Sequence, residues 1–595
     1  MEYTDLPIGQ QRLKEFMELL QRYRAGKANT EQRILASENW WKLRNTAEEQ
    51  RAGATRGDGF ASRSGWLHNV IVSKHADGVE AYPEPNILPR EEADKAEARM
   101  LSAIIPCVLE QNRFEQTWSD VLWQKLKTGT GVYKIFWDPN RLGGLGDIGI
   151  ERVNLLNLYW EPGITDIQKS RYLFHTELQD KELLQQRYPQ LRDKLRGNSF
   201  VSAKFLYDDA VTDADKVTVI DVYYRKQVGG RTVLHFCKFV EDEVLYATEN
   251  DLLPRVDLLG QEKPAPAEAG LYDHGFYPYV FDVLYPIEGS PCGYGFVDLC
   301  RNPQTEIDIL KTAFVKNARV GAVPRYFSRM DGNVNEEQFL DLEQALVKVS
   351  GNVDDATLRK IEHNTLDGNY IAMLDRTIDE LRQTSGNTEV GTGTASSGVT
   401  AASAIAALQE ASGKGSRDST LTSYRAYSLL VELAVELIRQ FYDMPRHFRI
   451  LGAAGGVEYV TYENRGLRPA QQPGLGEAGM RLPVFDIKVS AQKKNVYTKV
   501  SQNELALQFF KLGFFDSRLT DQALLCLEMM DFDGKDAIMQ RLSQRLPLLT
   551  VPPLPKREGE VGMPRSDSIL GLEKKEHAVV TKAREQTLSA TQPRQ

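Results

Sequence analysis

The chain has 595 residues, of which 42% are hydrophobic and 26% are charged. This length exceeds what one hydrophobic core usually serves, so we expect several domain-sized units, and the composition excludes a wholly disordered protein. The net charge of −9 disfavours a protein that grips DNA phosphates over its whole surface, yet it is compatible with a wall past which DNA slides.

The sequence carries no evident membrane or export signal. Its longest strongly apolar stretch, Leu429 to Ile438, is far shorter than the roughly 20 residues that span a bilayer. The first residues lack the basic start and apolar run of a secretory signal. The five cysteines form no CxxC pair, which favours plain reduced thiols. We therefore expect a cytoplasmic protein with no membrane association.

The first elements in chain order are helical. Residues 10 to 27 place Leu13 and Phe16 at helical spacing, and Gly26 predicts the end of this helix. A second helical region is expected from about residue 90 to residue 129.

Strand-like segments then recur. They lie at residues 148–160, 216–227, 230–247 and 277–286, and a short helix is expected at 179–195 between them. Helices and strands are thus mixed along the chain, which predicts an α+β fold.

A long helix, a small mixed segment and a returning helix follow. The first helix is expected over residues 296–320 (FVDLCRNPQTEIDILKTAFVKNARV), with Ile307 and Leu310 on one side. The segment after it contains strand-like and helical stretches, and the returning helix covers about residues 365–383. The sequence therefore predicts two helices that bracket a small α/β insertion.

The next segment, NTEVGTGTASSGVTAASA from residue 387, is rich in small and hydroxyl residues, and only Glu389 is charged. We interpret it as a loop. A long helix from about Ser416 to Tyr442, further strands, and a helical region over residues 499–546 follow it. The polar C-terminal tail is expected to be loosely ordered.

Three patterns that would indicate an enzyme or a metal site are weak. Residues 144–149 (GLGDIG) match the dinucleotide fingerprint, but an extended segment follows where a helix is required, so we interpret them as a hairpin turn. Residues 413–416 do not fulfil the phosphate-binding P-loop pattern. His235 and Cys237 share one strand face without a third ligand in sight. We expect no catalytic residues, no cofactor and no bound metal.

Six tryptophans admit two interpretations. They could stack on nucleic-acid bases, but such residues more often anchor a core or a subunit interface, which we favour. They are Trp40, Trp41, Trp118, Trp123, Trp137 and Trp160.

The order of several segments resembles the portal proteins of tailed double-stranded DNA bacteriophages, also called head-to-tail connectors. The resemblance rests on their order along the chain, because no single motif is diagnostic. The segments are SENWWKLRN (37–45), KTGTGVYKIFWDP (127–139), VNLLNLYWEPGITDIQKSRYLF (153–174), the HGxYP and GxG stretch within 272–308, SGVTAASAIAALQEASG (397–413) and NELALQFFKLGFF (503–515).

The resemblance implies a multidomain α+β portal fold. Its parts would be an N-terminal wing at 1–297, stem helices at 298–320 and 365–386 around a clip at 321–364, a tunnel loop at 387–400, the rest of the wing at 401–498, a helical crown at 499–548 and a flexible tail at 549–595.

The resemblance also implies sites. The DNA-facing tunnel loop would contain Asn387, Thr388, Glu389, Val390, Gly391, Thr392, Gly393, Thr394, Ser396 and Ser397, although an exposed linker is the alternative. Lys311, Lys316 and Arg319 would line the channel, unless they form only a solvated helix face. Arg325, Tyr326, Arg329 and Asp331 would contact partners from the clip.

The implied function is a ring at one capsid vertex for DNA packaging, retention and ejection. The ring would be a homo-oligomer, with twelve subunits in the virion, and would be assembled in the host cytoplasm. Its partners would be the double-stranded phage DNA, the terminase large subunit, head-to-tail adaptor or tail proteins, the major capsid protein and the scaffold. Alternatives are another phage head-completion or tail structural protein and a nuclease or nucleotide hydrolase.

Overall fold

The computed structural model describes most of the chain up to residue 530. The described residues are 7–43, 63–192, 194–195, 216–256, 262–322, 326–328, 337, 358–360, 366, 368–387, 414–451, 457–468, 470–471, 480–491, 496–513, 520–530 and 538. The chain divides into two units, residues 1–514 with 529–533 and residues 515–528 with 534–595. Helices and strands are mixed in the first unit, which confirms the α+β class.

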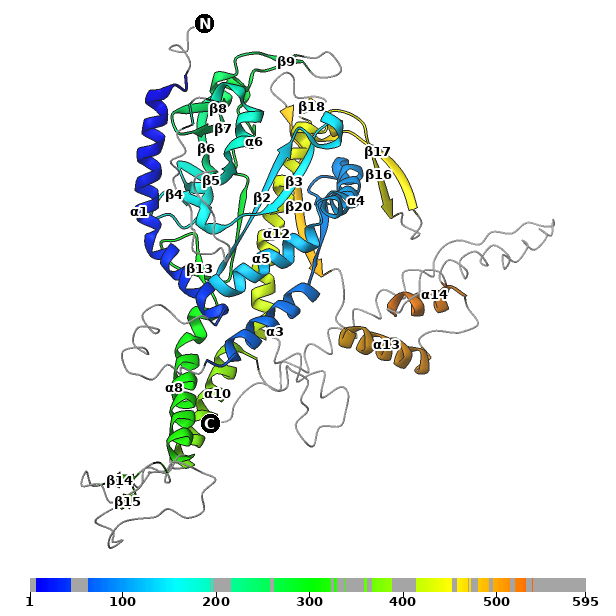
Figure 1. Cartoon of the computed structure of the whole chain (residues 1–595). Helices are drawn as coiled ribbons and strands as arrows, with labels where there is room; N and C mark the ends of the chain where they lie inside the picture. Colours follow the sequence, from blue (N-terminus) through cyan, green and yellow to red (C-terminus); the bar gives the residue numbers. More distant parts are fainter. Residues whose placement is uncertain are drawn as a thin grey trace, which may run out of the picture. The chain divides into compact units, whose positions relative to one another are not determined.

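A five-stranded antiparallel sheet forms one part of the first unit. Its strand order is β4-β5-β6-β7-β8 (Figure 1). Val222 on β6 stands opposite both Phe174 on β5 and Cys237 on β7, so these three side chains share one face. The strands are Leu158–Trp160, Tyr172–Asp180, Lys216–Val228, Arg231–Val240 and Glu243–Ala247.

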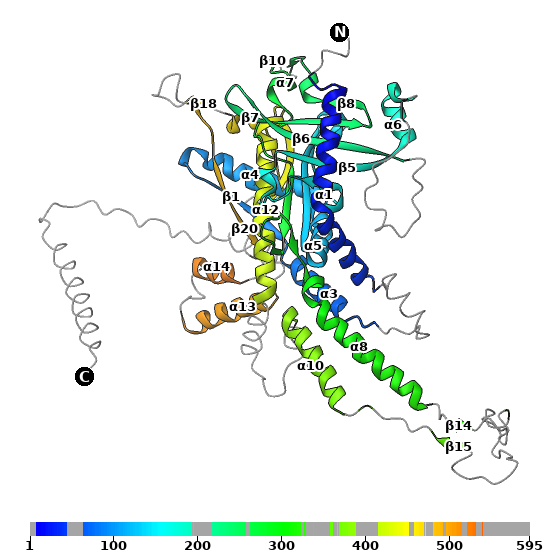
Figure 2. The ribbon, with the colours of Figure 1, turned by 90° about the vertical axis from the view of Figure 1, so that its left-hand side faces the viewer.

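Helix α1 (Gln10–Trp41) covers that face (Figures 1 and 2). Its Phe16 and Leu20 are fully buried in one cluster with Phe174, Val222 and Cys237. The spacing of four residues puts both α1 side chains on the same side of the helix.

The predicted end of this helix at Gly26 is wrong, because α1 continues for another fifteen residues to Trp41. Gly26 instead lies against Pro162, and a Cβ at this position would be 2.5 Å from the Pro162 Cγ. The glycine therefore serves a close approach between the helix and a loop. Gly26 therefore does not terminate the helix.

A three-stranded antiparallel sheet, β11-β2-β3, lies at the centre of the main core. Helix α12 (Lys414–Phe441) returns from far along the sequence to pack against β11 and β2. Helices α4 (Lys95–Gln111) and α5 (Phe114–Thr128) complete this core, where the prediction had one continuous helical region. The strands are Thr130–Asp138 (β2), Asp147–Arg152 (β3) and Tyr279–Val283 (β11).

Residues 144–146 of the GLGDIG segment lie in the connection between β2 and β3, and residues 147–149 begin β3, so the segment is part of a hairpin as predicted. The tryptophans that the structure describes pack inside the protein. Trp118 and Trp160 are buried in the main core, and Trp137 packs against it. Trp40, Trp41 and Trp123 pack against a second cluster around α3, α5 and α8. This supports the core interpretation of these residues.

Helix α3 and strand β1 are among the elements that had no counterpart in the sequence prediction. Helix α3 (Trp66–Glu80) lies directly before strand β1 (Pro83–Pro89), which pairs antiparallel with β20 (Phe485–Ala491). Proline lacks an amide hydrogen and is confined to sheet edges, so a strand with three prolines was not recognised. Its partner strand is about 400 residues away in sequence, so a local sequence pattern could not reveal the pairing.

Helices α8 (Phe296–Ala322) and α10 (Gly368–Ser385) lie side by side in both views (Figures 1 and 2). The helices predicted at 296–320 and at about 365–383 correspond to them, and the bounds agree to within three residues. Between them, β14 (Tyr326–Ser328) pairs antiparallel with β15 (Leu358–Lys360). The helix expected between these two strands lies outside the described residues.

The remaining elements are short or peripheral. They are α6 (Lys181–Arg187), β9 (Arg255–Val256), β10 (Glu262–Lys263), α7 (Pro266–Ala269), β12 (Tyr285–Pro286), β13 (Gly293–Tyr294), β16 (Arg446–Leu451), β17 (Val457–Tyr462), β18 (Ala470–Gln471), β19 (Met480–Arg481), α13 (Val496–Lys511) and α14 (Thr520–Met529). Among the described helices, none combines the length and apolarity needed to cross a membrane.

Candidate functional site at the helical hairpin

The hairpin of α8 and α10 is held together by apolar side chains near its base. Ile307 of α8 and Leu381 of α10 are almost fully buried in one cluster, and Leu374 and Ile378 pack against it. Leu374, Ile378 and Leu381 recur at three- and four-residue spacing, so they form one stripe along α10.

Other apolar side chains of the hairpin are exposed in the single chain. Ile309 is 62% exposed, Tyr370 46%, Ile371 54% and Met373 53%. In the single chain, these four apolar side chains of the hairpin are thus open to solvent.

The three predicted channel-lining residues all lie on α8. Lys311 is half-buried, whereas Lys316 and Arg319 are exposed. Lys316 and Arg319 are neighbours at three-residue spacing, while Lys311 lies about 140° around the helix from Lys316, at 100° per residue. The helix thus brings two of the three side chains close together.

The base of α8 binds the beginning of α3. The Leu67 backbone N–H donates to Gln304 Oε1 at 3.1 Å, and the Ser64 N–H and hydroxyl donate to Asp308 Oδ1 at 2.8 and 2.5 Å. The Gln304 side-chain amide also donates to the Ser64 carbonyl at 3.0 Å. Backbone N–H groups at a helix start have no partner within the helix, so these α8 side chains act as its cap.

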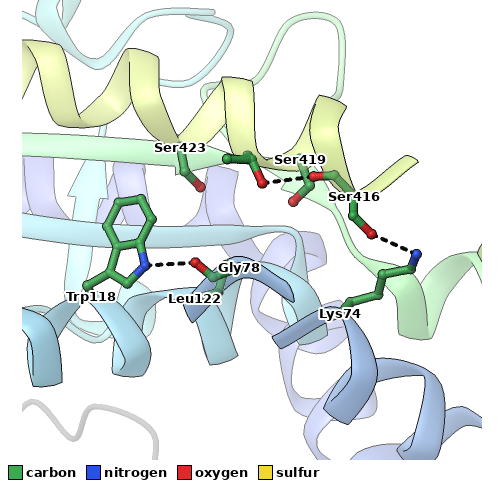
Figure 3. A pocket seen from close by; sticks show the side chains of 8 residues that line it. Lys74, Gly78, Trp118, Leu122, Ser416, Ser419 and Ser423 are labelled. Carbon is green, nitrogen blue, oxygen red and sulfur yellow. Dashed lines mark hydrogen bonds between the residues drawn. The ribbon is translucent and has the colours of Figure 1, made fainter. Parts of the chain in front are cut away.

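Further along α3, Lys74 contacts both segments that flank residues 388–413. Its ammonium donates to the Gly386 carbonyl at the end of α10 (3.3 Å) and to the Ser416 hydroxyl at the start of α12 (2.9 Å). The Ser416 hydroxyl in turn donates to Asp77 at 2.7 Å. Figure 3 shows Lys74 pointing at Ser416 along the edge of a small pocket between α3, α5 and α12.

The position of α3 against α5 is fixed by two aromatic contacts. The Trp118 indole N–H donates to the Gly78 carbonyl at 3.2 Å, a bond drawn in Figure 3. The His75 ring stacks on Trp123 with the ring centres 3.7 Å apart. Burial lowers the pKa of His75, so this ring packs as a neutral group near pH 7.

The first turns of α12 cover a buried ion pair. Lys125 of α5 lies 2.7 Å from Asp282 of β11, and both side chains are almost completely buried. The Lys125 ammonium also donates to the Ser419 carbonyl and to the hydroxyls of Thr422 and Ser423, at 2.8, 2.8 and 2.6 Å. Burial lowers the pKa of Lys125, and the Asp282 carboxylate opposes this effect.

Most of the predicted loop and clip residues lie outside the described part of the chain. Of the loop, only Asn387 is described, and its side-chain oxygen lies 3.4 Å from the Ser73 hydroxyl. Of the clip candidates, Tyr326 lies on β14, while Arg325, Arg329 and Asp331 are not described. Thr388, Glu389, Val390, Gly391, Thr392, Gly393, Thr394, Ser396 and Ser397 are not described either.

Sequence reasoning missed the polar residues that hold the ends of the loop segment. Lys74, Asp77, Lys125 and Asp282 belong to no motif, and their partners are distant in sequence. The interval between Lys74 and Ser416 is 342 residues. Lysines within apolar helical stretches were a weak signal, since a lysine is seldom buried unless it is paired.

The described part of the chain offers no cluster of side chains typical of a metal site. Its His, Cys, Asp and Glu side chains form no group of three that could hold a metal ion. His235 bonds to the Thr248 hydroxyl at 2.9 Å and stacks on Tyr224. Burial raises the pKa of the Cys237 thiol to about 12, so it is not a ready nucleophile or ligand.

Comparison with known proteins identifies one family. The family model described as "Phage P22-like portal protein" matches residues 79–254 and 273–562, which together make up most of the chain. The second matched range contains the hairpin of α8 and α10, both flanks of residues 388–413, and α12. The search of curated proteins gave no match.

Proposed function

The chain belongs to the family of P22-like phage portal proteins, and from this premise we propose that α8 and α10 are the stem helices of a DNA channel. Portal proteins are structural proteins of the phage capsid that serve as the channel for DNA packaging and connect head and tail. They act as an oligomeric ring whose partners are phage DNA, terminase, capsid proteins and tail proteins.

The observation that carries the stem assignment is the hairpin itself. Two long helices lie side by side, and the segment between them begins and ends in strands that pair with each other, β14 and β15. Such an insertion leaves and re-enters the hairpin at one end. We therefore assign residues 321–364 as the clip, with Arg325, Tyr326, Arg329 and Asp331 as contacts for terminase and later for adaptor or tail proteins.

We assign the exposed cations of α8 to the channel wall. Ring symmetry repeats Lys316 and Arg319 once in every subunit, so even two side chains make a band of positive charge that passing phosphates meet. Lys311 is half-buried and would contribute less. A net negative chain with a narrow cationic band holds DNA weakly and lets it move.

The exposed apolar side chains of the hairpin suit contact with the neighbouring copy of the chain. In a closed ring each subunit presents one face to the next subunit, so an apolar face left open in one chain is covered by its neighbour. Ile371 and Met373 are two residues apart on α10 and point to opposite sides of the helix, so each of the two neighbouring subunits meets one of them. We propose a ring of twelve subunits in the virion, assembled in the host cytoplasm before it joins the capsid.

Ile371→Asp tests this assignment. The change is expected to reduce the yield of rings at least tenfold and to leave folded monomers, because each interface would bury an unpaired carboxylate. The measurement is the ring fraction from light scattering and circular dichroism of the monomer fraction.

Asn369→Asp is the matched control. It adds the same charge to the exposed first turn of α10, at a position that is already polar. It should leave the ring fraction unchanged. Equal ring yields for both variants would contradict a subunit interface on this face.

We assign residues 387–400 as the tunnel loop, residues 1–297 and 401–498 as the wing, and residues 499–548 as the crown. The composition of the loop supports its assignment, since GTGTASS at residues 391–397 carries no charge and only small side chains. Such a segment neither clashes with DNA grooves nor binds phosphates.

A further inference from the structure

Helix α3 connects parts of the protein that are far apart in sequence. Its beginning is capped by Gln304 and Asp308 of α8, and its middle contacts both flanks of residues 388–413. We propose that Lys74 is a positioning residue that ties the end of α10 to the start of α12, and that α3 couples this tie to the first stem helix. The function of this coupling rests on the tunnel-loop assignment above.

The environment of Lys74 is typical of a buried link between the end of α10 and the start of α12, and not of a contact on the protein surface. Lys74 is only 7% exposed, and its ammonium uses two of its three N–H donors, one on each flank. Hydrogen bonds from a charged donor are stronger than neutral ones, and a site shielded from water strengthens them further. Asp77 supports the arrangement, because its carboxylate accepts a hydrogen bond from the Ser416 hydroxyl and supplies the opposite charge.

The end of α10 is shaped to present its carbonyl to Lys74. Gly386 has a left-handed backbone with φ of +66°, and the Asn387 N–H folds back to the Arg382 carbonyl at 3.0 Å. This is a common helix-terminating turn. The Gly386 carbonyl lies at the negative end of the helix dipole, where a cation is favoured.

The other contacts of α3 fix both ends of this helix to neighbouring helices. Its first turn is bound to α8, and its last turn is bound to α5 through the Trp118 and Gly78 hydrogen bond. A side chain at Gly78 would lie 2.4 Å from Leu122, so the two helices are already in close contact. A displacement of α8 against the wing would therefore move Lys74, and with it both flanks of residues 388–413.

The test uses Lys74→Met in assembled rings of the full chain. Methionine keeps most of the length of the side chain and removes the charge and all donors. Amide hydrogen exchange should become roughly tenfold faster at Gly386 and Asn387 and also at Thr420 in the first turns of α12, as expected when a charge-assisted bond is lost. Particles that carry this variant should lose packaged DNA faster than wild-type particles.

Lys95→Met is the matched control, because Lys95 is an exposed lysine whose ion pair is with Glu92 on the surface. It should leave exchange at both flanks unchanged. Ser416→Ala is a second, milder variant that breaks the tie from the α12 side. Combined with Lys74→Met it should add little to the single change, because both remove the same link.

The outcomes distinguish the proposed role of Lys74 from the function assigned to residues 387–400. Unchanged exchange in Lys74→Met rings, either at Gly386 and Asn387 or at Thr420, would overturn the inference, whatever happens to the DNA. Faster exchange at both flanks supports the tie. If DNA retention then stays normal, the tie stands and the function assigned to residues 387–400 fails.

Discussion

Deleting residues 391–397 is expected to leave ring assembly intact and to abolish stable retention of packaged DNA. The deleted residues, GTGTASS, are small and uncharged, so few stabilising contacts depend on them. Their flanks at Gly386 and Ser416 remain bound to Lys74. The measurement is encapsidated DNA per particle, compared with the yield of rings from the same preparation.

Replacing Ser396 and Ser397 with lysine tests the same segment by its charge. Each subunit would add two cations to the channel, and DNA movement should slow in a way that weakens with added salt, because counterion release governs phosphate binding. Ser396→Gln with Ser397→Gln is the control, since it adds length without charge. Normal DNA content and infectivity for the deletion and for the lysine variant would show that the segment is an exposed linker.

Asp282→Ala is expected to lower the free energy of unfolding by about 3–5 kcal/mol, because Lys125 would remain buried with no counterion. Lys125 would keep its bonds to Ser419, Thr422 and Ser423, but neutral partners do not offset the cost of a buried charge. The loss should appear as faster exchange of protected amides in β11 and α12 and as a lower urea midpoint.

A double variant and a surface control complete this experiment. Adding Lys125→Met to Asp282→Ala should restore part of the lost stability, because no unpaired charge remains. Asp486→Ala removes the same type of side chain from an exposed ion pair with Arg90, and it should leave unfolding almost unchanged. Equal effects of Asp282→Ala and Asp486→Ala would contradict the structural role of the buried pair.

Local periodicity predicted the elements whose apolar pattern is visible within their own stretch of sequence. The long helices α8 and α12 and the strands β6 and β7 follow their apolar patterns closely, because each buries one face or both faces along its own length. The end of α1 was missed, since Gly26 meets Pro162 across the fold and not a helix terminus. Strand β1 was missed because its partner is β20.

The candidate site could be predicted only in part. The hairpin and the low-charge segment after it were visible in the sequence, since both depend on composition within one stretch. The contacts of Lys74 and the ion pair of Lys125 were not, because the partners of both lysines are distant in sequence and the local pattern around a lysine does not identify them. Their environment is created by Ser416 and Asp282, which long-range folding brings near.

Electron microscopy of the purified 595-residue chain tests whether it assembles into a channel. We expect class averages of closed rings with an axial channel, in which α8 and α10 of neighbouring subunits lie side by side around the channel wall. A single molar mass equal to the monomer across protein concentrations and salt, with no rings in the micrographs, would contradict this expectation.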